Sequence, residues 1–431
     1  MNRVKMLCLT FCCLFFYFYG LSQEKIIIEG YVEDKNSGER LIQATIYDTQ
    51  SKKWTVTNAY GHYNIVYLKK QKVELYCSYT GFYTDTVTLF PSNDTTINFK
   101  LSPSTQLNEV TVKANKPIHK RTEISTVEID TKQIENLPSL GGEVDIMKSF
   151  QLMPGVERGI EGSSNIYVRG GGHGQNLILL DDIPLYYVNH FGGLVSVFNS
   201  NALKKVKLIK GGFPAKYGDR LSSVMDIRMK DGNMKKLTGN LNIGLVSAGI
   251  SLEGPIKKDT TSYMISLRRF MLDLLALKPA AYFLSEGKST FGYGFYDINA
   301  KINHKISHKN RIYASFYLGD DYIKTKYTDK DDTEKVVSKN NTNWGNLLFS
   351  VRWNHLFSKK MFSNISLYYA RFRHNQMVDF EMKEESEHLQ IQDKKTTSIH
   401  DFGTRIDFDY TISSKYKLKF GMHSVFQRSQ P

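Results

Sequence analysis

Residues 401–410 read Asp-Phe-Gly-Thr-Arg-Ile-Asp-Phe-Asp-Tyr, and residues 415–423 read Lys-Tyr-Lys-Leu-Lys-Phe-Gly-Met-His. In both stretches an apolar, mostly aromatic set of residues alternates with a polar set that is mostly charged. Successive side chains of a β-strand point to opposite faces, so this alternation predicts strands with one apolar face and one charged face. Such strands suit a boundary between lipid and water.

The same pattern extends from about residue 238 to residue 426. Segments of about ten residues, with short turns on one rim and long loops on the other, are typical of outer-membrane β-barrels. The connections at 307–310 and 358–360 are short, whereas those at 320–343 and 374–397 are long and rich in Asp, Glu and Lys. We predict eight antiparallel strands, at residues 238–252, 262–270, 294–306, 311–319, 344–357, 361–373, 398–411 and 415–426. The first of them changes face part-way, which we interpret as a bulge.

A barrel of eight strands is too narrow to enclose a globular domain formed by the preceding part of the chain. An eight-stranded barrel is filled by its own side chains, whereas a barrel that encloses a globular domain has about 22 strands. Unpaired first and last edges are also costly in lipid. At roughly 24 residues per strand and connection, about 22 strands require a protein of about 770 residues. We therefore expect this chain to be the front portion of a longer protein, by truncation or gene interruption, which does not close into a barrel alone.

The N-terminus reads as a secretory signal peptide over residues 1–22. A basic start precedes an apolar run at 6–19 and the small-residue segment Gly-Leu-Ser at 20–22, so the mature chain is expected to begin near Gln23. The rival interpretation, a membrane anchor, is disfavoured because the run is shorter than the roughly 20 residues of a spanning helix. Removal of the signal leaves Cys77 as the single cysteine, which cannot form an internal disulfide.

The formal net charge is +14 at pH 7. A basic balance can indicate nucleic-acid binding. Here the lysines alternate along strands or lie in long connections and form no dense patch, so we predict no nucleic-acid partner. Solvated loops and a positively lined lumen account for the charge, and such a lumen would favour anionic solutes.

Residues 23–102 predict a small β-sandwich, because several short strands are separated by turn residues. The predicted strands are 25–32, 44–48, 62–67, 73–79 and 84–89. The region resembles the carboxypeptidase regulatory-like family, a transthyretin-like sandwich. The resemblance rests on Gly-Tyr-Val-Glu-Asp at 30–34, Gly-Glu-Arg-Leu-Ile-Gln-Ala-Thr-Ile at 38–46, Thr-Asn-Ala-Tyr-Gly-His-Tyr at 57–63 and Tyr-Thr-Gly-Phe at 79–82.

This resemblance does not imply peptidase activity. A zinc peptidase needs two nitrogen ligands and a carboxylate that converge on the metal. The region contains neither His-Glu-x-x-His nor His-x-x-Glu, and His62 is its single histidine. We predict that the protein is not an enzyme and that this domain is a scaffold or a partner contact.

Residues 121–233 carry a mixed α/β pattern. The spacing of apolar residues predicts a helix within 139–152, and strands are predicted at 165–168, 177–180 and 206–209. Three motifs in this region resemble the plug domain of TonB-dependent outer-membrane receptors. They are Ile-Tyr-Val-Arg-Gly-Gly-Gly at 166–172, Leu-Ile-Leu-Leu-Asp-Asp-Ile-Pro-Leu at 177–185, and Val-Lys-Leu-Ile-Lys-Gly-Gly-Phe-Pro-Ala-Lys-Tyr-Gly-Asp-Arg at 206–220.

The resemblance implies a globular domain packed against a barrel wall, with glycines that supply backbone freedom for tight turns. The family usually has Gly where this chain has Asp182, a minor departure. We expect Arg169 and Arg220 to be buried partners of wall carboxylates. The residues expected to pack between plug and barrel are Arg169, Gly170, Gly171, Asp181, Gly211, Tyr217, Gly218 and Arg220.

Two glycine-rich segments could be taken for phosphate-binding loops, but neither fits. Gly-Gly-Gly-His-Gly at 170–174 lacks the Lys-Ser/Thr ending and the strand–helix context of a P-loop. Gly-Lys-Ser-Thr at 287–290 has that ending, but Tyr282 stands where the pattern needs Gly. We predict no catalytic site, no cofactor and no metal.

The connector 103–120 is polar and contains Glu-Val-Thr-Val-Lys-Ala at 109–114. An exposed extended segment with alternating β-branched residues can add a strand to the sheet edge of another protein. The segment also resembles the TonB box, which implies that Glu109, Val110, Thr111 and Val112 contact TonB. The alternative is an ordinary linker or a first plug strand.

The predicted fold is therefore mainly β. It consists of an N-terminal β-sandwich (23–102), a small α/β plug (121–233) and the first part of a transmembrane β-barrel, about eight antiparallel strands in residues 234–431. The resemblance implies a receptor in the cell outer membrane for TonB-dependent uptake of a scarce solute, such as a siderophore, vitamin, peptide or glycan. The alternative is a non-transporting surface or periplasmic binding protein with vestigial strands.

The expected partners are the TonB energising complex of the inner membrane, an extracellular solute and outer-membrane lipid. A surface lipoprotein is a further candidate, because the starch-utilisation branch of the family shares the N-terminal sandwich. The end of the plug in that branch differs from Arg-Leu-Ser-Ser-Val-Met-Asp-Ile at 220–227, which disfavours a glycan importer of that type.

Overall fold

The structure is a computed structural model of the whole chain. It describes residues 25–69, 71–104, 126–130, 133, 139–140, 142–159, 163–330, 334–384, 387–413 and 416–431. The predicted signal peptide (1–22) and the TonB-box-like segment (109–112) lie outside the described residues. Within the described ranges, no helix combines the length and apolar character that a membrane span needs.

The N-terminal domain is a sandwich of two four-stranded sheets. One sheet contains β4, β1, β7 and β8, and the other has the order β3-β2-β5-β6. Its core consists of apolar side chains from both sheets, including Ile28, Ile46, Leu75 and Phe99. The strands are β1 (Lys25–Asp34), β2 (Thr45–Asp48), β3 (Trp54–Val56), β4 (His62–Leu68), β5 (Val73–Ser78), β6 (Asp85–Leu89), β7 (Thr95–Thr96) and β8 (Phe99–Leu101).

The middle domain is built on a five-stranded sheet with the order β15-β14-β19-β18-β9. Strands β14 and β19 are parallel neighbours, so they need a crossover connection, and β18 lies on the other side of β19. The strands are β9 (Thr126–Asp130), β10 (Ser139–Leu140), β11 (Glu143–Val144), β12 (Val156–Arg158), β13 (Ile166–Val168), β14 (Asn176–Leu180), β15 (Ile183–Pro184), β16 (Asn189–His190), β17 (Val195–Ser196), β18 (Leu203–Lys210) and β19 (Ser223–Met229). Short 3-10 turns are η2 (His173–Gln175), η3 (Phe191–Gly193) and η4 (Ser200–Ala202).

The helix predicted within 139–152 is much shorter than expected. Helix α3 spans only Ile146–Phe150, and its N-cap Asp145 accepts hydrogen bonds from the backbone N–H groups of Met147 and Lys148. The residues before it form the hairpin β10–β11. Gly142 in the hairpin turn has a φ of +85°, a left-handed conformation that would interrupt a helix.

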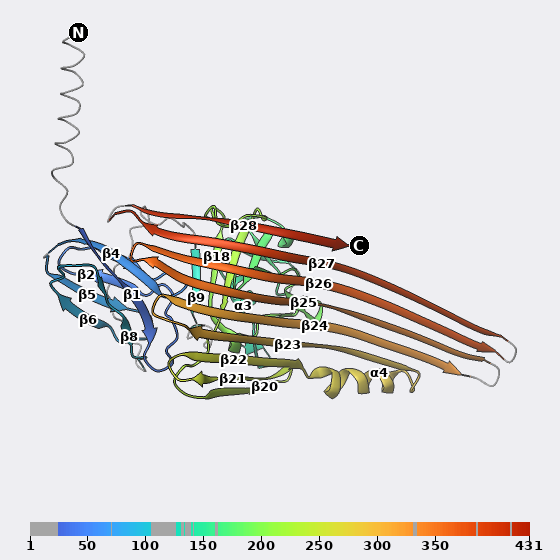
Figure 1. Cartoon of the computed structure of the whole chain (residues 1–431). Coiled ribbons are helices and arrows are strands. Elements are labelled where there is room, and N and C mark those ends of the chain that lie inside the picture. The colour runs from blue at the N-terminus through green and yellow to red at the C-terminus, as the bar shows by residue number, and fades with distance from the viewer. Residues whose placement is uncertain are drawn as a thin grey trace, which may run out of the picture.

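The C-terminal part is one antiparallel sheet of nine strands, β20 to β28 in sequence order, which we call the wall (Figure 1). The strands are β20 (Thr238–Ile243), β21 (Ser247–Lys257), β22 (Thr261–Phe270), β23 (Ser289–Lys305), β24 (Asn310–Lys330), β25 (Glu334–Ser358), β26 (Met361–Glu384), β27 (His388–Thr411) and β28 (Lys417–Gln430). The π-helix η5 (Asp273–Leu277) and helix α4 (Lys278–Leu284) connect β22 to β23. The predicted fold class is confirmed: a sandwich, an α/β domain and a partial antiparallel barrel sheet.

The strand count and the long connections differ from the prediction. The segment 238–252 is not one bulged strand: it turns between β20 and β21, where Gly244 N–H donates to the Ser247 carbonyl over 2.9 Å. The predicted long loops 320–343 and 374–397 are instead the extended arms of hairpins β24–β25 and β26–β27. Their polar residues continue the ladder beyond the apolar band, because backbone pairing does not depend on side-chain polarity.

The wall has two unlike faces, as the alternation predicted. Strand register places Tyr369 opposite Phe402 and Phe402 opposite Phe426, so these residues share one face, which we call the outer face. Outer-face apolar side chains are well exposed, with Leu367 at 59% and Phe402 at 56%. On the opposite, inner face, polar residues such as Asp297, Ser366 and Arg405 are buried.

The sandwich and the middle domain both pack against the wall (Figure 1). The sandwich lies at the end of the wall where the short turns are: Asn64 Nδ2 donates to the Lys359 carbonyl over 3.2 Å, and Thr411 Oγ1 donates to Asn64 Oδ1 over 2.8 Å. The middle domain packs on the inner face, where its core includes Met264, Tyr317, Leu348, Tyr368 and Ala370 of the wall. The hairpin arms extend away from the sandwich.

Candidate functional site

The site begins at a tight turn that follows strand β14. The apolar run 177–180 carries the chain into the domain core and ends at Asp181 and Asp182, whose φ angles are +50° and +70°. This left-handed conformation favours Gly, although Asp tolerates it better than most residues. Both carboxylates are nearly inaccessible, with 1% exposure for Asp181 and 4% for Asp182.

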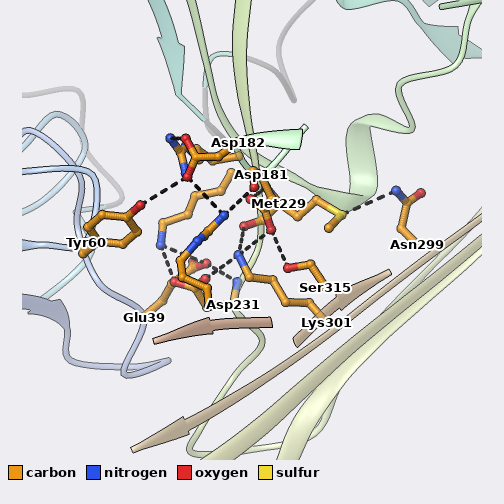
Figure 2. A network of polar contacts seen from close by, with 12 residues as sticks. Glu39, Tyr60, Asp181, Asp182, Met229, Asp231, Asn299, Lys301 and Ser315 are labelled. Atoms are coloured by element: carbon orange, nitrogen blue, oxygen red, sulfur yellow. Dashed lines mark hydrogen bonds and ion pairs between the residues drawn. The ribbon is translucent and has the colours of Figure 1, made fainter. Parts of the chain in front are cut away.

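Asp181 joins the middle domain to the wall. Its Oδ2 lies 3.0 Å from Lys301 Nζ on β23 and accepts a hydrogen bond of 2.8 Å from Ser315 Oγ on β24 (Figure 2). Its Oδ1 accepts from the Met229 N–H over 3.1 Å. Burial of Asp181 raises its pKa, but Lys301 and Arg352 outweigh this, and the net pKa is lowered. The carboxylate is therefore charged when the domain is docked.

Asp182 gathers partners from all three parts of the molecule. Arg228 on β19 donates to both oxygens, from Nη1 to Oδ2 over 2.6 Å and from Nη2 to Oδ1 over 2.5 Å. Arg352 Nη2 on the wall lies 3.2 Å from Oδ2, and Arg405 Nη1 lies 3.7 Å from Oδ1. From the sandwich, the Tyr60 hydroxyl donates to Oδ2 over 3.2 Å. Burial raises the pKa of Asp182, but Arg228 and Arg352 hold it well below its usual range.

Asp231 of the middle domain also connects the wall to the sandwich, through Lys301 on one side and Lys204 and Glu39 on the other. Its carboxylate lies 2.8 Å from Lys301 Nζ and 2.7 Å from Lys204 Nζ. Glu39 of the sandwich lies 3.3 Å from the same Lys204 and accepts a hydrogen bond of 2.7 Å from the Asp231 N–H. Figure 2 shows the side chains of Glu39, Asp231 and Lys301 meeting in this group.

We call these eight residues the charge network: Glu39, Asp181, Asp182, Lys204, Arg228, Asp231, Lys301 and Arg352. Four are acidic and four basic, so the network is electrically balanced. A buried ion pair adds little net stability, but removal of one partner leaves an uncompensated buried charge, which costs about 3–5 kcal/mol. The network therefore specifies how the parts fit together more than it stabilises any one of them.

The network is closely packed. Residues that include Ile42, Tyr60, Lys204, Asp231 and Arg352 surround a cavity with space for about one water molecule. The ring of Tyr60 lies close to two guanidinium groups, 5.9 Å from that of Arg228 and 5.6 Å from that of Arg352. This geometry gives cation–π attraction in addition to the hydrogen bond.

A second connection between the middle domain and the wall centres on His190 of β16. Its Nδ1 lies 2.6 Å from Asp321 Oδ2, and its Nε2 lies 3.0 Å from Asp297 Oδ1. The imidazole stacks on Phe295 with 4.1 Å between ring centres. Arg268 completes the group by donating to Asp297 from Nε over 2.8 Å. Burial lowers the pKa of His190, but the two carboxylates outweigh it and raise the pKa to about 9.

The structure separates the predicted packing residues into two places. Asp181 and Tyr217 lie at the network, where Tyr217 donates to Asp226 over 3.1 Å and Asp226 in turn lies 2.8 Å from Arg228 Nε. Gly211, with a φ of +71°, lies against the side chain of Arg169 at an edge of the middle domain. A Cβ at Gly171 would lie 2.5 Å from Ser222 Oγ, which explains the absence of a side chain there. Gly170 and Gly218 have open space around them.

The expectation that Arg169 and Arg220 are buried partners of wall carboxylates is not met. Arg169 is exposed, and Arg220 is half-buried with its Nη1 donating to the Asp219 carbonyl. At the charge network the polarity is the reverse, because carboxylates of the middle domain meet cations of the wall, whereas at the second connection His190 of the middle domain meets wall carboxylates. Glycine motifs predict turns well, but they do not reveal which neighbouring charge points inward.

Four central residues carry no signal in the sequence: Tyr60, His190, Lys301 and Arg352. Asp182 was noted only as a minor departure from a family pattern. That departure was the available signal, because an acidic residue at a position that favours Gly must gain something from its carboxylate. The predicted TonB-contact residues Glu109, Val110, Thr111 and Val112 lie outside the described residues. Among the residues that the structure describes, no cluster of three or more His, Cys, Asp or Glu side chains could hold a metal ion.

Two family models match the chain. Residues 28–112 match the CarboxypepD_reg-like domain, and residues 119–223 match the TonB-dependent Receptor Plug Domain. None of the curated proteins matches the sequence.

Several solved structures are similar to parts of this chain at low identity. They include the siderophore receptor PirA from Acinetobacter baumannii (13% identity, 70% of this chain and 61% of that chain, TM-score 0.36). They also include the ferric citrate transporter FecA in the unliganded form (9%, 72% and 60%, TM-score 0.41) and the outer membrane transporter YddB from Escherichia coli (11%, 70% and 56%, TM-score 0.39). The chain thus spans about 60% of the length of the first structures that it matches. By its family matches, the chain carries a carboxypeptidase regulatory-like domain followed by the plug domain of TonB-dependent receptors.

Proposed function

We propose that this protein is an outer-membrane receptor that imports an extracellular solute by TonB-dependent active transport. One observation carries the proposal: the plug domain is fixed by buried charges to the inner face of a sheet whose outer face is apolar and exposed. Such a sheet is suited to lipid on one side and to a filled lumen on the other. In this proposal residues 23–102 are the sandwich, 121–233 the plug and 234–431 the first part of the barrel.

The proposed orientation follows from the rims. Short turns are on the periplasmic rim of outer-membrane barrels and long connections on the extracellular rim. The sandwich contacts the short-turn end, so it is assigned to the periplasm, and the arms of β24–β25 and β26–β27 are assigned to the outside. The solute would bind between these arms and the plug. Siderophore, vitamin, peptide and glycan remain the candidate classes, because fold does not fix the ligand.

Transport requires the plug to move, and this movement must break the ion pairs of the charge network, which costs free energy. Pulling Asp181 away from Lys301, or Asp182 away from Arg352, exposes or strands buried charges. Spontaneous opening is therefore rare, and a mechanical pull from TonB on residues 109–112 would supply the energy. The sandwich is attached to the same network through Tyr60 and Glu39, so it would have to release before or together with the plug.

The alternative of a non-transporting binder with vestigial strands fits the geometry less well. In that alternative the sandwich and plug act alone, and Asp181 would lose Lys301 and Ser315. A buried carboxylate that depends on the wall for its cation is expected where the wall is part of the working unit.

The proposed contact with TonB is tested by a proline substitution in the intact receptor. Strand addition requires backbone N–H donors, and proline lacks one. We expect Val110→Pro to abolish uptake of the solute, while Val110→Ile, which keeps the donor and the β-branched side chain, retains it. Both variants should remain in the outer membrane at wild-type abundance. Undiminished uptake by Val110→Pro, or by a receptor lacking residues 108–114, would show that this segment is not the contact through which TonB drives uptake.

A further inference from the structure

Two buried arginines meet where the sandwich contacts the wall. Arg40 belongs to the sandwich and Arg311 lies at the start of β24, and their exposed fractions are 5% and 6%. Arg40 Nε is 3.2 Å from Glu33 Oε1, and Arg311 Nη2 is 3.7 Å from the same oxygen. We call Glu33, Arg40 and Arg311 the junction cluster. Within the described ranges, two cations from different parts of the molecule thus share one carboxylate of the sandwich.

The guanidinium donors of the junction cluster are largely without acceptors in the part of the chain that the structure describes. Arg40 Nε and Nη1, and all three guanidinium nitrogens of Arg311, are buried there without an aligned hydrogen-bond acceptor. Each guanidinium group carries five N–H donors and stays charged at neutral pH. The Tyr31 ring lies 3.5 Å from the guanidinium carbon of Arg40, but a cation–π contact covers the face of the group and leaves its N–H donors free. Buried donors of this kind are usually satisfied by a bound water molecule or ion.

The charges around the junction cluster do not compensate its second arginine. Lys305 of β23 faces the cluster and adds positive charge. Asp231 and Tyr313 face Arg311, but the Asp231 carboxylate is already paired with two lysines of the charge network, and a phenol is ordinarily uncharged at neutral pH. Burial, followed by the charge of Arg311, lowers the pKa of Arg40 to about 10. The cluster therefore carries an excess of positive charge.

Arg228 of the plug shows how this protein satisfies a buried guanidinium group with its own side chains. Arg228 donates to both oxygens of Asp182, and its Nε lies 2.8 Å from Asp226 Oδ1. One arginine has two carboxylates at that position. At the junction cluster, two equally buried arginines have one carboxylate among the described residues.

We propose that the junction cluster binds one chloride ion, which joins the sandwich to the wall. A monovalent anion balances the second guanidinium group, whereas a water molecule accepts hydrogen bonds without balancing charge. A single atom can accept N–H donors from both arginines, whereas a phosphate would also bring oxygens toward the Glu33 carboxylate, which repels them. Because Arg40 and Arg311 come from different parts, the complete site exists only in the docked state. This inference concerns the attachment of the sandwich and does not depend on the solute that is imported.

The test compares chloride with the bulky anion gluconate at constant ionic strength, in the purified full-length protein. Two quantities are measured: the line width of the chloride NMR signal, which increases when chloride exchanges with a site on the protein, and the rate of proteolysis between sandwich and plug. An ion that binds only the docked state favours docking by the factor 1 + [chloride]/Kd. Chloride at about nine times its Kd should therefore slow proteolysis about tenfold.

Substitution of either arginine should remove the requirement for chloride. Arg311→Gln leaves Glu33 paired with Arg40 alone, and Arg40→Gln leaves it paired with Arg311 alone, so each variant is balanced without an anion. We expect both variants to lose the excess line width and to be cleaved at a rate that chloride does not change. The matched control is Lys309→Gln, which removes the same charge from an exposed residue of the neighbouring turn and should respond to chloride as the wild type does.

Two results would overturn the proposal. One is equal cleavage of the wild type in chloride and gluconate, which is the outcome expected if the arginines are satisfied by water. The other is a chloride effect that persists in both arginine variants, which would place the ion elsewhere on the protein.

Discussion

The hydroxyl of Tyr60 in the sandwich donates a hydrogen bond of 3.2 Å to Asp182 in the plug, across 122 residues of sequence. The same carboxylate is held by Arg228 of the plug and Arg352 of the wall. The Asp182 side chain thus contacts all three parts of the molecule. Burial raises the pKa of Tyr60 well above its usual value, so the phenol stays protonated and can donate.

Removal of that hydroxyl should loosen the sandwich without unfolding it. We expect Tyr60→Phe to destabilise docking by about 1.5–3 kcal/mol, the typical value for a hydrogen bond to a charged group. The measurement is the rate of proteolysis between sandwich and plug in the purified protein. Tyr83→Phe, at a residue that is 50% exposed, serves as the control and should leave the rate unchanged. Equal rates in all three proteins would show that Tyr60 does not hold the sandwich.

A glycine at position 182 should destabilise the plug even though it suits the backbone better. Asp182→Gly relieves a φ of +70°, a gain of about 1–2 kcal/mol, but it leaves buried Arg352 without its ion pair and Arg228 with Asp226 alone, at a cost of about 3–5 kcal/mol. We expect a net loss of about 1–4 kcal/mol in the free energy of unfolding measured with urea. Asp182→Gly/Arg352→Met should recover part of this loss, because it also removes the cation that the glycine leaves without an ion pair. A glycine variant as stable as the wild type would contradict the role assigned to this carboxylate.

Lys301 should be the wall residue on which plug docking depends most. Its ammonium lies 3.0 Å from Asp181 and 2.8 Å from Asp231, so Lys301→Met leaves two buried carboxylates without that cation. We expect a loss of about 3–5 kcal/mol, read as faster hydrogen exchange in β14 and β19. The exposed Lys257→Met is the control. In a double-mutant cycle with Asp181→Asn, additivity of the two effects would mean that the pair is not coupled.

The connection at His190 should weaken as pH rises. The folded-state pKa of about 9 lies above the ordinary value of 6.5, because Asp297 and Asp321 outweigh the effect of burial. Protonated His190 therefore stabilises docking fully below about pH 6.5, and this contribution is lost as the pH rises toward and through 9. We expect plug release, followed by protease accessibility of residues 189–196, to increase over this window. In His190→Gln the profile should be flatter, and an identical profile would exclude His190 as its source.

Much of the fold could be predicted because local chemistry determined it. The alternation at 401–410 places Phe402 and Arg405 on opposite faces, and the ladder confirms that arrangement. Turn glycines and apolar runs likewise predicted β13, β14 and β18 to within a few residues. The sequence predicts loops beyond Asp320 because these polar segments carry no apolar period, although their backbone pairing is continuous.

The candidate site was far less predictable. Tyr60, Asp182, Lys301 and Arg352 come from three regions of the sequence and meet only when the sandwich, plug and wall are assembled. A single charged residue in a strand looks the same whether it faces water or a buried partner. The prediction that Arg169 and Arg220 are the buried partners of wall carboxylates is wrong, because glycine-rich motifs indicate backbone geometry and not side-chain partners.

The central claim is that the wall separates lipid from a filled interior, and a cysteine scan of β27 tests it most directly. Spin labels are placed singly at residues 402–409 in a Cys77→Ser background, and collisions with oxygen and with a water-soluble nickel chelate are measured in membranes. We expect labels at Phe402, Thr404, Ile406 and Phe408 to meet oxygen and labels at the odd positions to be shielded from it. Uniform shielding across all eight positions, or the absence of a period of two, would contradict the account.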